Sequence, residues 1–161
     1  MIRPMNDSDS QVVLEIYKKG LDTRNATFET KAPPWTNWDR SHHKFCRFVY
    51  VDSESVVGWV ALSPISIRPC YSGVAEISIY VDPQHAGKGI GDALMAHVIQ
   101  DSEKRGIWTL YSSIFPENNA TLQLHLKHGF REVGLRERIA KLDGKWRSTL
   151  ILERRSNVVG N

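Results

Sequence analysis

The segment from residue 76 to residue 92 holds the residues most able to do chemistry. Glu76 opens a β-branched run that ends at Val81, which is typical of a short buried strand. A carboxylate in this position can act as a general base. An acid at the start of a strand is also often only solvated or ion-paired, so the residue type leaves both interpretations open.

Three glycines follow the strand, at positions 87, 89 and 91, alternating with Lys88 and Ile90 just before a helical pattern. Backbone amides at such a turn can surround an anion at the helix N-terminus, an arrangement that suits a pyrophosphate. Glycines at a turn can equally serve only positive φ angles or close packing. The spacing is neither that of a Walker loop, since Lys88 is followed by Gly89, nor that of a dinucleotide fingerprint.

The composition bounds the class of protein. A chain of 161 residues with 41% hydrophobic and 24% charged residues predicts one globular domain, with neither extensive disorder nor a membrane-spanning run. We expect a single domain over residues 1–153 and a frayed tail over residues 154–161. The net charge of +3 is too diffuse to indicate nucleic acid.

The first residues carry no secretory signal pattern, so a cytoplasmic location is expected. Cys46 and Cys70, the only cysteines, are then expected to be free thiols. The six histidines show no HExxH or paired-cysteine spacing, so no metal site is expected.

The elements that must position these residues follow from periodicity and from glycine and proline punctuation. The predicted strands are residues 1–4, 46–51, 56–62, 76–81, 108–114, 130–133, 138–142 and 147–153. The predicted helices start at Asp7 or Ser8 and stop at Gly20, span residues 35–43, follow the glycine turn to Gly106, and span residues 120–128 with Leu122, Leu124 and Leu126 inward. The order βααβββαβαββ predicts an α/β (α+β) fold with a mixed, largely antiparallel central sheet flanked by helices.

The turn before the third helix resembles the acetyl-CoA turn of the GNAT superfamily of N-acetyltransferases, Gln/Arg-x-x-Gly-x-Gly/Ala. Gly89 and Gly91 match its small positions, whereas Ala86 replaces the Gln or Arg. The predicted order of elements is also that of the GNAT fold. Within the superfamily the chain is most similar to phosphinothricin and methionine sulfoximine N-acetyltransferases over nearly its whole length. The matching pieces are Ile16-Tyr17, Ala26-Thr27-Phe28, Val57-Gly58-Trp59, the strand from Glu76 to Val81, the GKGIG turn, Asn118-x-x-Thr121, His125 through Gly129-Phe130, and Lys141 to Trp146. Ser148 stands where that family usually has Asp.

The resemblance implies an acetyl-CoA-dependent N-acetyltransferase in which Glu76 is the general base and transfer to the amine is direct. A backbone N–H after Glu76 would polarise the thioester carbonyl. The resemblance implies these cofactor-binding residues: Ile79, Tyr80 and Val81 along the pantetheine arm, Gly87, Lys88, Gly89, Ile90, Gly91 and Asp92 at the pyrophosphate, and Asn118 near the reactive end. From its residue type, Asn118 is equally a helix cap, as is Asn119.

The resemblance further implies an acceptor that is a small amino acid analogue, of the methionine sulfoximine, methionine sulfone or phosphinothricin type. Arg68 would meet its negative end, and Phe28 and Tyr71 would wall its pocket. Phe28 could instead be anchored in the core and Arg68 could be merely solvated. No general acid is assigned, because a thiol with a pKa of about 8.5 leaves without one.

The alternatives are a GNAT enzyme acting on a polyamine, an aminoglycoside or a protein N-terminus, and a non-catalytic acyl-CoA binder. An acidic pocket lining would favour cationic acceptors. The resemblance also implies a homodimer, with no metal, nucleic-acid or membrane partner.

Overall fold

A computed structural model describes residues 1–161 and contains one seven-stranded sheet of order β1-β2-β3-β4-β5-β7-β6. All strand pairs are antiparallel except β4 with β5. The elements are β1 (Ile2–Pro4), α1 (Ser10–Asp22), α2 (Trp35–Ser41), β2 (Phe48–Asp52), β3 (Ser55–Pro64), β4 (Val74–Val81), α3 (Ile90–Lys104), β5 (Thr109–Ile114), α4 (Asn119–Lys127), β6 (Arg131–Leu142) and β7 (Lys145–Arg155), with 3₁₀ turns at Asp7–Asp9, Pro69–Tyr71 and Pro83–His85. The predicted fold class is confirmed, and the elements follow the predicted order βααβββαβαββ, with the eight predicted strand segments forming seven strands.

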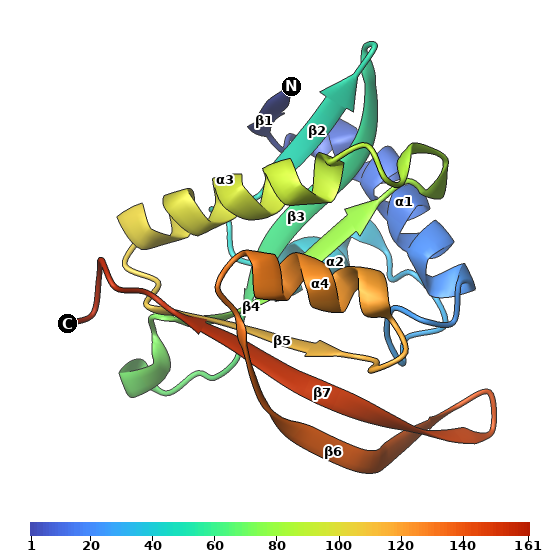
Figure 1. Ribbon diagram of the computed structural model, residues 1–161. Coiled ribbons are helices and arrows are strands. Elements are labelled where there is room, and N and C mark those ends of the chain that lie inside the picture. Colours follow the sequence, from blue (N-terminus) through green and yellow to red (C-terminus); the bar gives the residue numbers. More distant parts are fainter.

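Helices cover both faces of the sheet (Figure 1). The larger hydrophobic core lies under α3 and includes Leu94, Val98 and Ile77, and Leu122 and Leu124 of α4 pack against it. The smaller core lies under α1 and α2 and includes Trp38 and Trp59. No helix is both long and apolar enough to cross a bilayer.

Side chains of β4 alternate between these two cores. Ile77, Ile79 and Val81 pack into the core under α3, whereas Tyr80 packs into the core under α1 and α2. Glu76 and Ser78 share the face of Tyr80 because they lie four and two residues before it along the strand. The predicted base is therefore directed toward α1 and α2.

Gly20 does not stop the first helix, as the sequence suggested, because α1 continues to Asp22. The glycine is needed for packing instead. A Cβ added there would lie 2.5 Å from Cδ1 of Tyr80. Gly20 therefore lets α1 approach the tyrosine ring of β4.

The prediction for Leu126 is also wrong, since 38% of this side chain is exposed. Leu124 faces Gly91 of α3, and Leu126, two residues later on the helix, points to nearly the opposite side, so the two cannot both face inward. His125 is the buried residue of α4 instead, 2% exposed.

The two strands predicted at residues 130–133 and 138–142 form one strand, β6, interrupted by register shifts between Glu132 and Gly134 and between Arg136 and Ala140. Bulges of this kind insert unpaired residues without ending a strand. Ser148, the residue that departs from the family pattern, supports the second bulge by accepting a hydrogen bond from Arg138 N at 2.9 Å.

The tail that was predicted to fray, residues 154–161, begins inside β7, which ends at Arg155. Ser156 N donates to Trp108 O at 2.8 Å, and Arg155 Nη1 donates to Val159 O at 3.0 Å. These contacts place the last residues against the start of β5.

Candidate active site

The strands β4 and β5 form a fork at Glu76. They pair at three positions only, the last being Glu76 with Tyr111. Beyond this point β4 continues to Val81 beside β3, while β5 continues to Ile114 beside β7. The edge of β4 that faces β5 therefore presents unpaired backbone groups after Glu76, and such an edge can pair with an extended, amide-containing chain.

The start of α3 lies just beyond this edge and has the geometry of an anion site. Gly87 and Gly89 adopt φ angles of 76° and 75°. The first helical hydrogen bond runs from Ala93 N to Gly89 O at 3.0 Å, so the amides before Ala93 have no helical partner. A Cβ on Gly87 or on Gly89 would meet nothing within 4 Å. The space beside these two Cα atoms is therefore open, and free amides at a helix N-terminus are a common binding site for phosphate groups.

Asp92, in the first turn of α3, directs its carboxylate to α4. It pairs with Lys127 Nζ at 2.7 Å and with His128 Nε2 at 2.8 Å. The hydrogen bond from Lys127, and then that from His128, lowers the pKa of Asp92. The side chain thus joins the two helices through its Oδ1 atom, and the predicted contact of Asp92 with the cofactor stays a prediction.

Asn118 is the N-cap of α4, the role that the sequence left open between Asn118 and Asn119. Its Oδ1 accepts from Thr121 N at 3.2 Å, and its Nδ2 donates to Asn25 O at 3.0 Å. The side chain therefore links α4 to the loop that joins α1 and α2, and its predicted cofactor contact stays a prediction.

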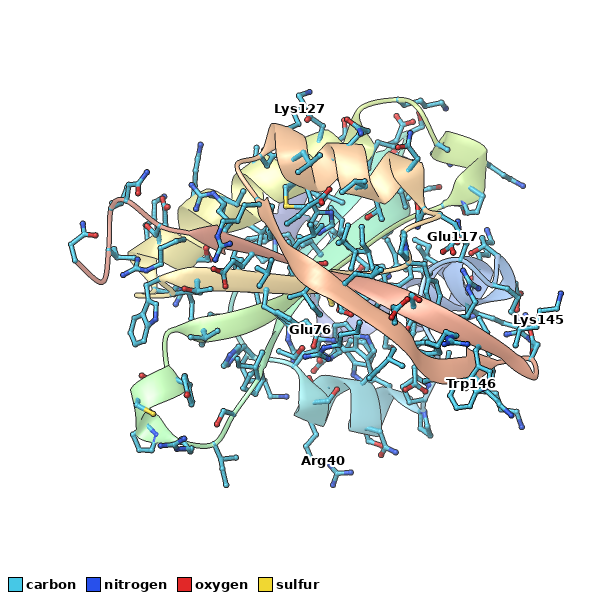
Figure 2. The ribbon with its side chains drawn as sticks, turned by 60° about the horizontal axis from the view of Figure 1, so that its bottom comes forward. Arg40, Glu76, Glu117, Lys127, Lys145 and Trp146 are labelled. Carbon is cyan, nitrogen blue, oxygen red and sulfur yellow. The ribbon has the colours of Figure 1, made fainter.

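Glu76 lies near the centre of the molecule, between the sheet and α2 (Figure 2). Its side chain is half-buried, and burial raises the pKa of its carboxyl above the ordinary value. The carboxylate takes part in none of the ion pairs of the structure. A carboxylate with a raised pKa and no cationic partner is suited to accepting a proton.

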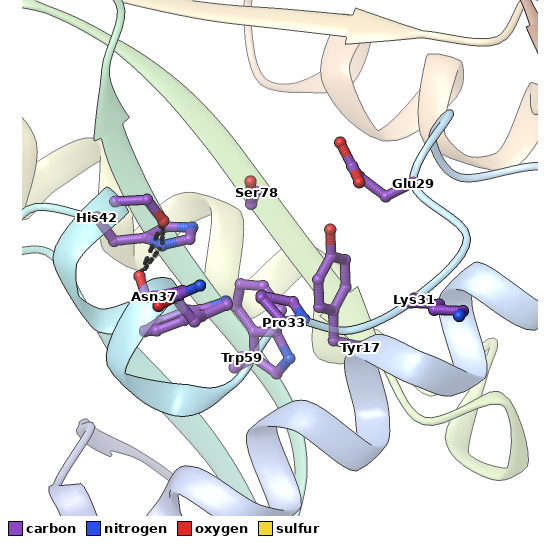
Figure 3. A pocket seen from close by; sticks show the side chains of 10 residues that line it. Tyr17, Glu29, Lys31, Pro33, Asn37, His42, Trp59 and Ser78 are labelled. Carbon is purple, nitrogen blue, oxygen red and sulfur yellow. Dashed lines mark hydrogen bonds between the residues drawn. The ribbon is translucent and has the colours of Figure 1, made fainter.

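A cavity of about 340 Å³ lies on the same face of β4 as Glu76 (Figure 3). It is lined by Tyr17, Glu29, Lys31, Pro33, Asn37, Trp38, Ser41, His42, Trp59 and Ser78. In Figure 3 the hydroxyl of Tyr17 points toward the carboxylate of Glu29. Burial, followed by the charges of Glu29 and Glu76, raises the pKa of Tyr17 to about 12, so this hydroxyl stays protonated at neutral pH.

His42 forms part of the cavity wall as a neutral ring. Burial lowers its pKa, and its Nδ1 lies 2.6 Å from Trp38 O. The ring also stacks on Trp38, with 4.0 Å between centroids. The cavity therefore combines the aromatic rings of Tyr17, Trp38, His42 and Trp59 with the polar residues Glu29, Lys31, Asn37, Ser41 and Ser78.

The three residues predicted to bind the acceptor lie in two different loops. Phe28 packs edge-on against Phe115, with centroids 5.0 Å apart, in the loop that also supplies Glu29 to the cavity. Arg68 and Tyr71 lie together in the loop between β3 and β4, both exposed, with the guanidinium 5.3 Å from the ring. None of these three residues lines the cavity, and Glu76 does not line it either.

Sequence reasoning did not single out most of the cavity lining. The sequence assigned Tyr17, Trp38 and Trp59 no role in a site. Their shared location depends on how α1 and α2 dock onto the sheet, which no local pattern specifies. The nearest signal was Phe28, because Glu29 and Lys31 follow it in the same loop.

Comparison with known proteins places these features in a family context. The profile of the Acetyltransferase (GNAT) family matches residues 13–130. YwnH of Bacillus subtilis, provisionally named a phosphinothricin acetyltransferase, is 35% identical over 95% of this chain and 97% of its own. The L-methionine sulfoximine/L-methionine sulfone acetyltransferase of Salmonella typhimurium is 24% identical over 90% of this chain and 88% of its own.

A solved structure repeats the fold. The GNAT superfamily phosphinothricin acetyltransferase of Sinorhizobium meliloti, in complex with acetyl-CoA, has a TM-score of 0.87 at 25% identity, covering 96% of this chain and 87% of that chain. Together with the match to the family profile, this similarity extends from the sequence to the arrangement of the sheet and helices.

Proposed function

The chain belongs to the GNAT family of acetyltransferases and uses acetyl-CoA, and we propose that it acetylates the α-amine of a small amino acid analogue with Glu76 as general base. The observation that supports this proposal is that the β4–β5 fork begins at Glu76, on the face of β4 whose next residue, Ser78, lines the cavity. The acyl donor would lie along the edge of β4, and the acceptor would lie on the Glu76 face.

Glu76 has the properties that the proton transfer requires. Acetyl-CoA supplies an activated thioester carbonyl. As the amine nitrogen bonds to the carbonyl carbon and the carbon–sulfur bond breaks, the nitrogen must lose a proton, which Glu76 accepts directly or through water. The raised pKa of Glu76 brings the base closer to neutral pH, where such a transfer is most efficient. An unpaired N–H of the β4 edge would donate to the carbonyl oxygen as charge develops there.

The cavity favours an amino acid analogue over a polycation. Trp38, Trp59 and Tyr17 supply apolar surface for a side chain that ends in a methyl group. The charged residues of the lining are Glu29 and Lys31, one of each sign, rather than a set of acids. A zwitterionic acceptor matches this lining better than a polyamine does. The named activities of the Salmonella typhimurium and Sinorhizobium meliloti relatives support the same substrate class.

Thiol release from acetyl-CoA in the presence of an acceptor panel tests the proposal. The panel comprises methionine sulfone, methionine sulfoximine and phosphinothricin, with spermidine, an aminoglycoside and a short peptide as rivals. We expect release with at least one amino acid analogue, at a kcat/KM at least about 10² times that of the rivals. Preference for spermidine or the peptide would contradict the proposed acceptor. Tight acetyl-CoA binding with no release for any amine would favour the non-catalytic binder.

We also propose that two copies of the chain associate through the β6–β7 hairpin, which projects from the body of the molecule (Figure 1). Val133, Leu135, Ile139 and Trp146 are 48%, 55%, 50% and 58% exposed on this hairpin. Apolar side chains gathered on one projecting element mark an interaction surface. Size-exclusion chromatography with light scattering should show a dimer that Ile139→Glu converts to a monomer, and a monomeric wild-type chain would contradict this proposal.

A further inference from the structure

The loop between α1 and α2, residues 23–34, is contacted from outside by Arg147 of β7, and the loop residue Arg24 also pairs through Nε with Asp143 Oδ2 in the β6–β7 turn at 3.1 Å. This loop carries Phe28 and supplies Glu29, Lys31 and Pro33 to the cavity, so its position sets the shape of the cavity. Arg147 lies across the first half of the loop, and only 20% of its side chain is exposed.

Arg147 makes polar contacts with two consecutive loop residues and with the start of α4. Its Nη1 donates to Arg24 O at 2.9 Å, and its Nη2 lies 3.4 Å from Asn25 Oδ1. The same Nη2 lies 3.4 Å from Glu117 Oε2. Because Asn118 Nδ2 donates to Asn25 O at 3.0 Å, the backbone of the loop is held at two successive carbonyls.

The guanidinium of Arg147 also contacts the aromatic ring of Phe115, against which the loop residue Phe28 packs. Its central carbon lies 3.9 Å from the centroid of Phe115, which is almost completely buried. Phe28 packs edge-on against the same ring at 5.0 Å. Arg147 therefore contacts one face of an aromatic pair whose other member belongs to the loop.

A planar, permanently charged guanidinium is required for this set of contacts. It can donate in two directions while its plane stacks on a ring, whereas a lysine ammonium is a point charge on a flexible stem. Neighbouring exposed residues of the hairpin, such as Arg136, have no comparable partner and form none of the ion pairs of the structure.

We propose that Arg147 is a positioning residue for the acceptor: it fixes residues 24–28 against α4 and β5, so that Phe28 and Glu29 stand where the acceptor binds. It does not line the cavity itself. This inference rests on the proposed function in so far as it assigns the cavity to the acceptor amine.

Limited trypsin proteolysis and steady-state kinetics of Arg147→Ala, with Arg136→Ala as the matched control, test the inference. If Arg147 holds the loop, cleavage after Arg24 and Lys31, mapped by mass spectrometry, should be at least about 5 times faster in Arg147→Ala, because the loop opens more often. We also expect a KM for the acceptor about 10 times higher, with the acetyl-CoA KM and the kcat at saturating acceptor within about 2-fold of wild type. Arg136→Ala should change neither.

Arg147→Lys gives a second measurement if the alanine variant fails to fold. It retains a donor for Arg24 O but loses the stacked plane, so its cleavage rate and acceptor KM should lie between those of wild type and Arg147→Ala. Unchanged loop cleavage in a folded Arg147 variant would overturn the inference that Arg147 holds the loop. Faster cleavage with an unchanged acceptor KM would overturn the role in acceptor positioning. A wild-type protein that acetylates no acceptor would instead count against the proposed function. The cleavage rates would still decide whether Arg147 holds the loop.

Discussion

The substitution Gly89→Val separates the stability of the glycine turn from its binding role. Gly89 has a φ angle of 75°, a conformation that a β-branched residue adopts only under strain. Such strain costs about 1–3 kcal/mol. A domain of this size loses roughly 2–4 °C of Tm per kcal/mol, so the variant should stay folded with a moderately lower Tm.

The loss of cofactor binding should be much larger than the loss of stability. A Cβ on Gly89 meets no protein atom within 4 Å, so the valine enters the space in front of the free amides of α3. Loss of two charge-assisted hydrogen bonds to a phosphate, at about 1.5–3 kcal/mol each, exceeds 3 kcal/mol in total and weakens acetyl-CoA binding by more than about 10²-fold.

Gly106 provides the matched control at the other end of α3. Its φ angle is 77°, and a Cβ there also meets nothing within 4 Å. Gly106→Val should lower the Tm by a similar amount and leave the acetyl-CoA Kd, measured by isothermal titration calorimetry, within about 2-fold of wild type. Normal acetyl-CoA binding by Gly89→Val, or equal weakening in both variants, would refute the assignment of the cofactor to this turn.

Three further predictions concern stability. Because burial raises the folded-state pKa of Glu76, its charged form opposes folding above the unfolded pKa of about 4.3. Glu76→Gln should therefore raise the Tm at pH 7 and leave the Tm unchanged at pH 4. An equal shift of the Tm at both pH values would contradict this prediction. Gly20→Ala should destabilise the protein in urea titrations by up to about 2 kcal/mol, since overpacking against Tyr80 at about 1–3 kcal/mol outweighs a helix-propensity gain of about 1 kcal/mol; a stabilised variant would refute the close packing. The hydrogen bond from Arg3 lowers the pKa of buried Asp9, so the stability contributed by the Arg3–Asp9 pair is present above the unfolded pKa of about 3.9 and is lost as the pH falls through the folded-state pKa. Asp9→Asn should therefore cost about 2 kcal/mol of unfolding free energy at pH 7 and less at pH 2. The same cost at both pH values would count against a stabilising role of this pair.

The order of the elements was predictable from the sequence because its signals are local. Glycines and prolines mark most boundaries, and short β-branched runs mark strands such as β4. The prediction failed where a local signal conflicted with a contact between residues that are distant in the chain. Gly20 carries a helix-stop signal, yet its lack of a side chain serves contact with Tyr80, a residue sixty positions away in the chain.

The candidate site was predictable only in the part that lies on one segment. Glu76 and the glycine turn are close in sequence, and their geometry follows from one strand, one turn and one helix. The fork depends on where the register of β4 with β5 ends, and the cavity depends on the docking of α1 and α2. Both are tertiary properties that leave no periodic trace in the sequence. For the same reason Arg147 carries no signal, since its partners in the loop, Arg24 and Asn25, lie more than a hundred residues before it.

The proposed chemistry is tested most directly by the kcat/KM of Glu76→Gln for the preferred amino acid analogue, measured with acetyl-CoA saturating. Glutamine keeps the shape of the side chain but cannot accept the proton. The account predicts a kcat/KM at least about 10² times lower, with acetyl-CoA affinity unchanged. A kcat/KM near that of the wild-type protein would remove Glu76 from the role of base.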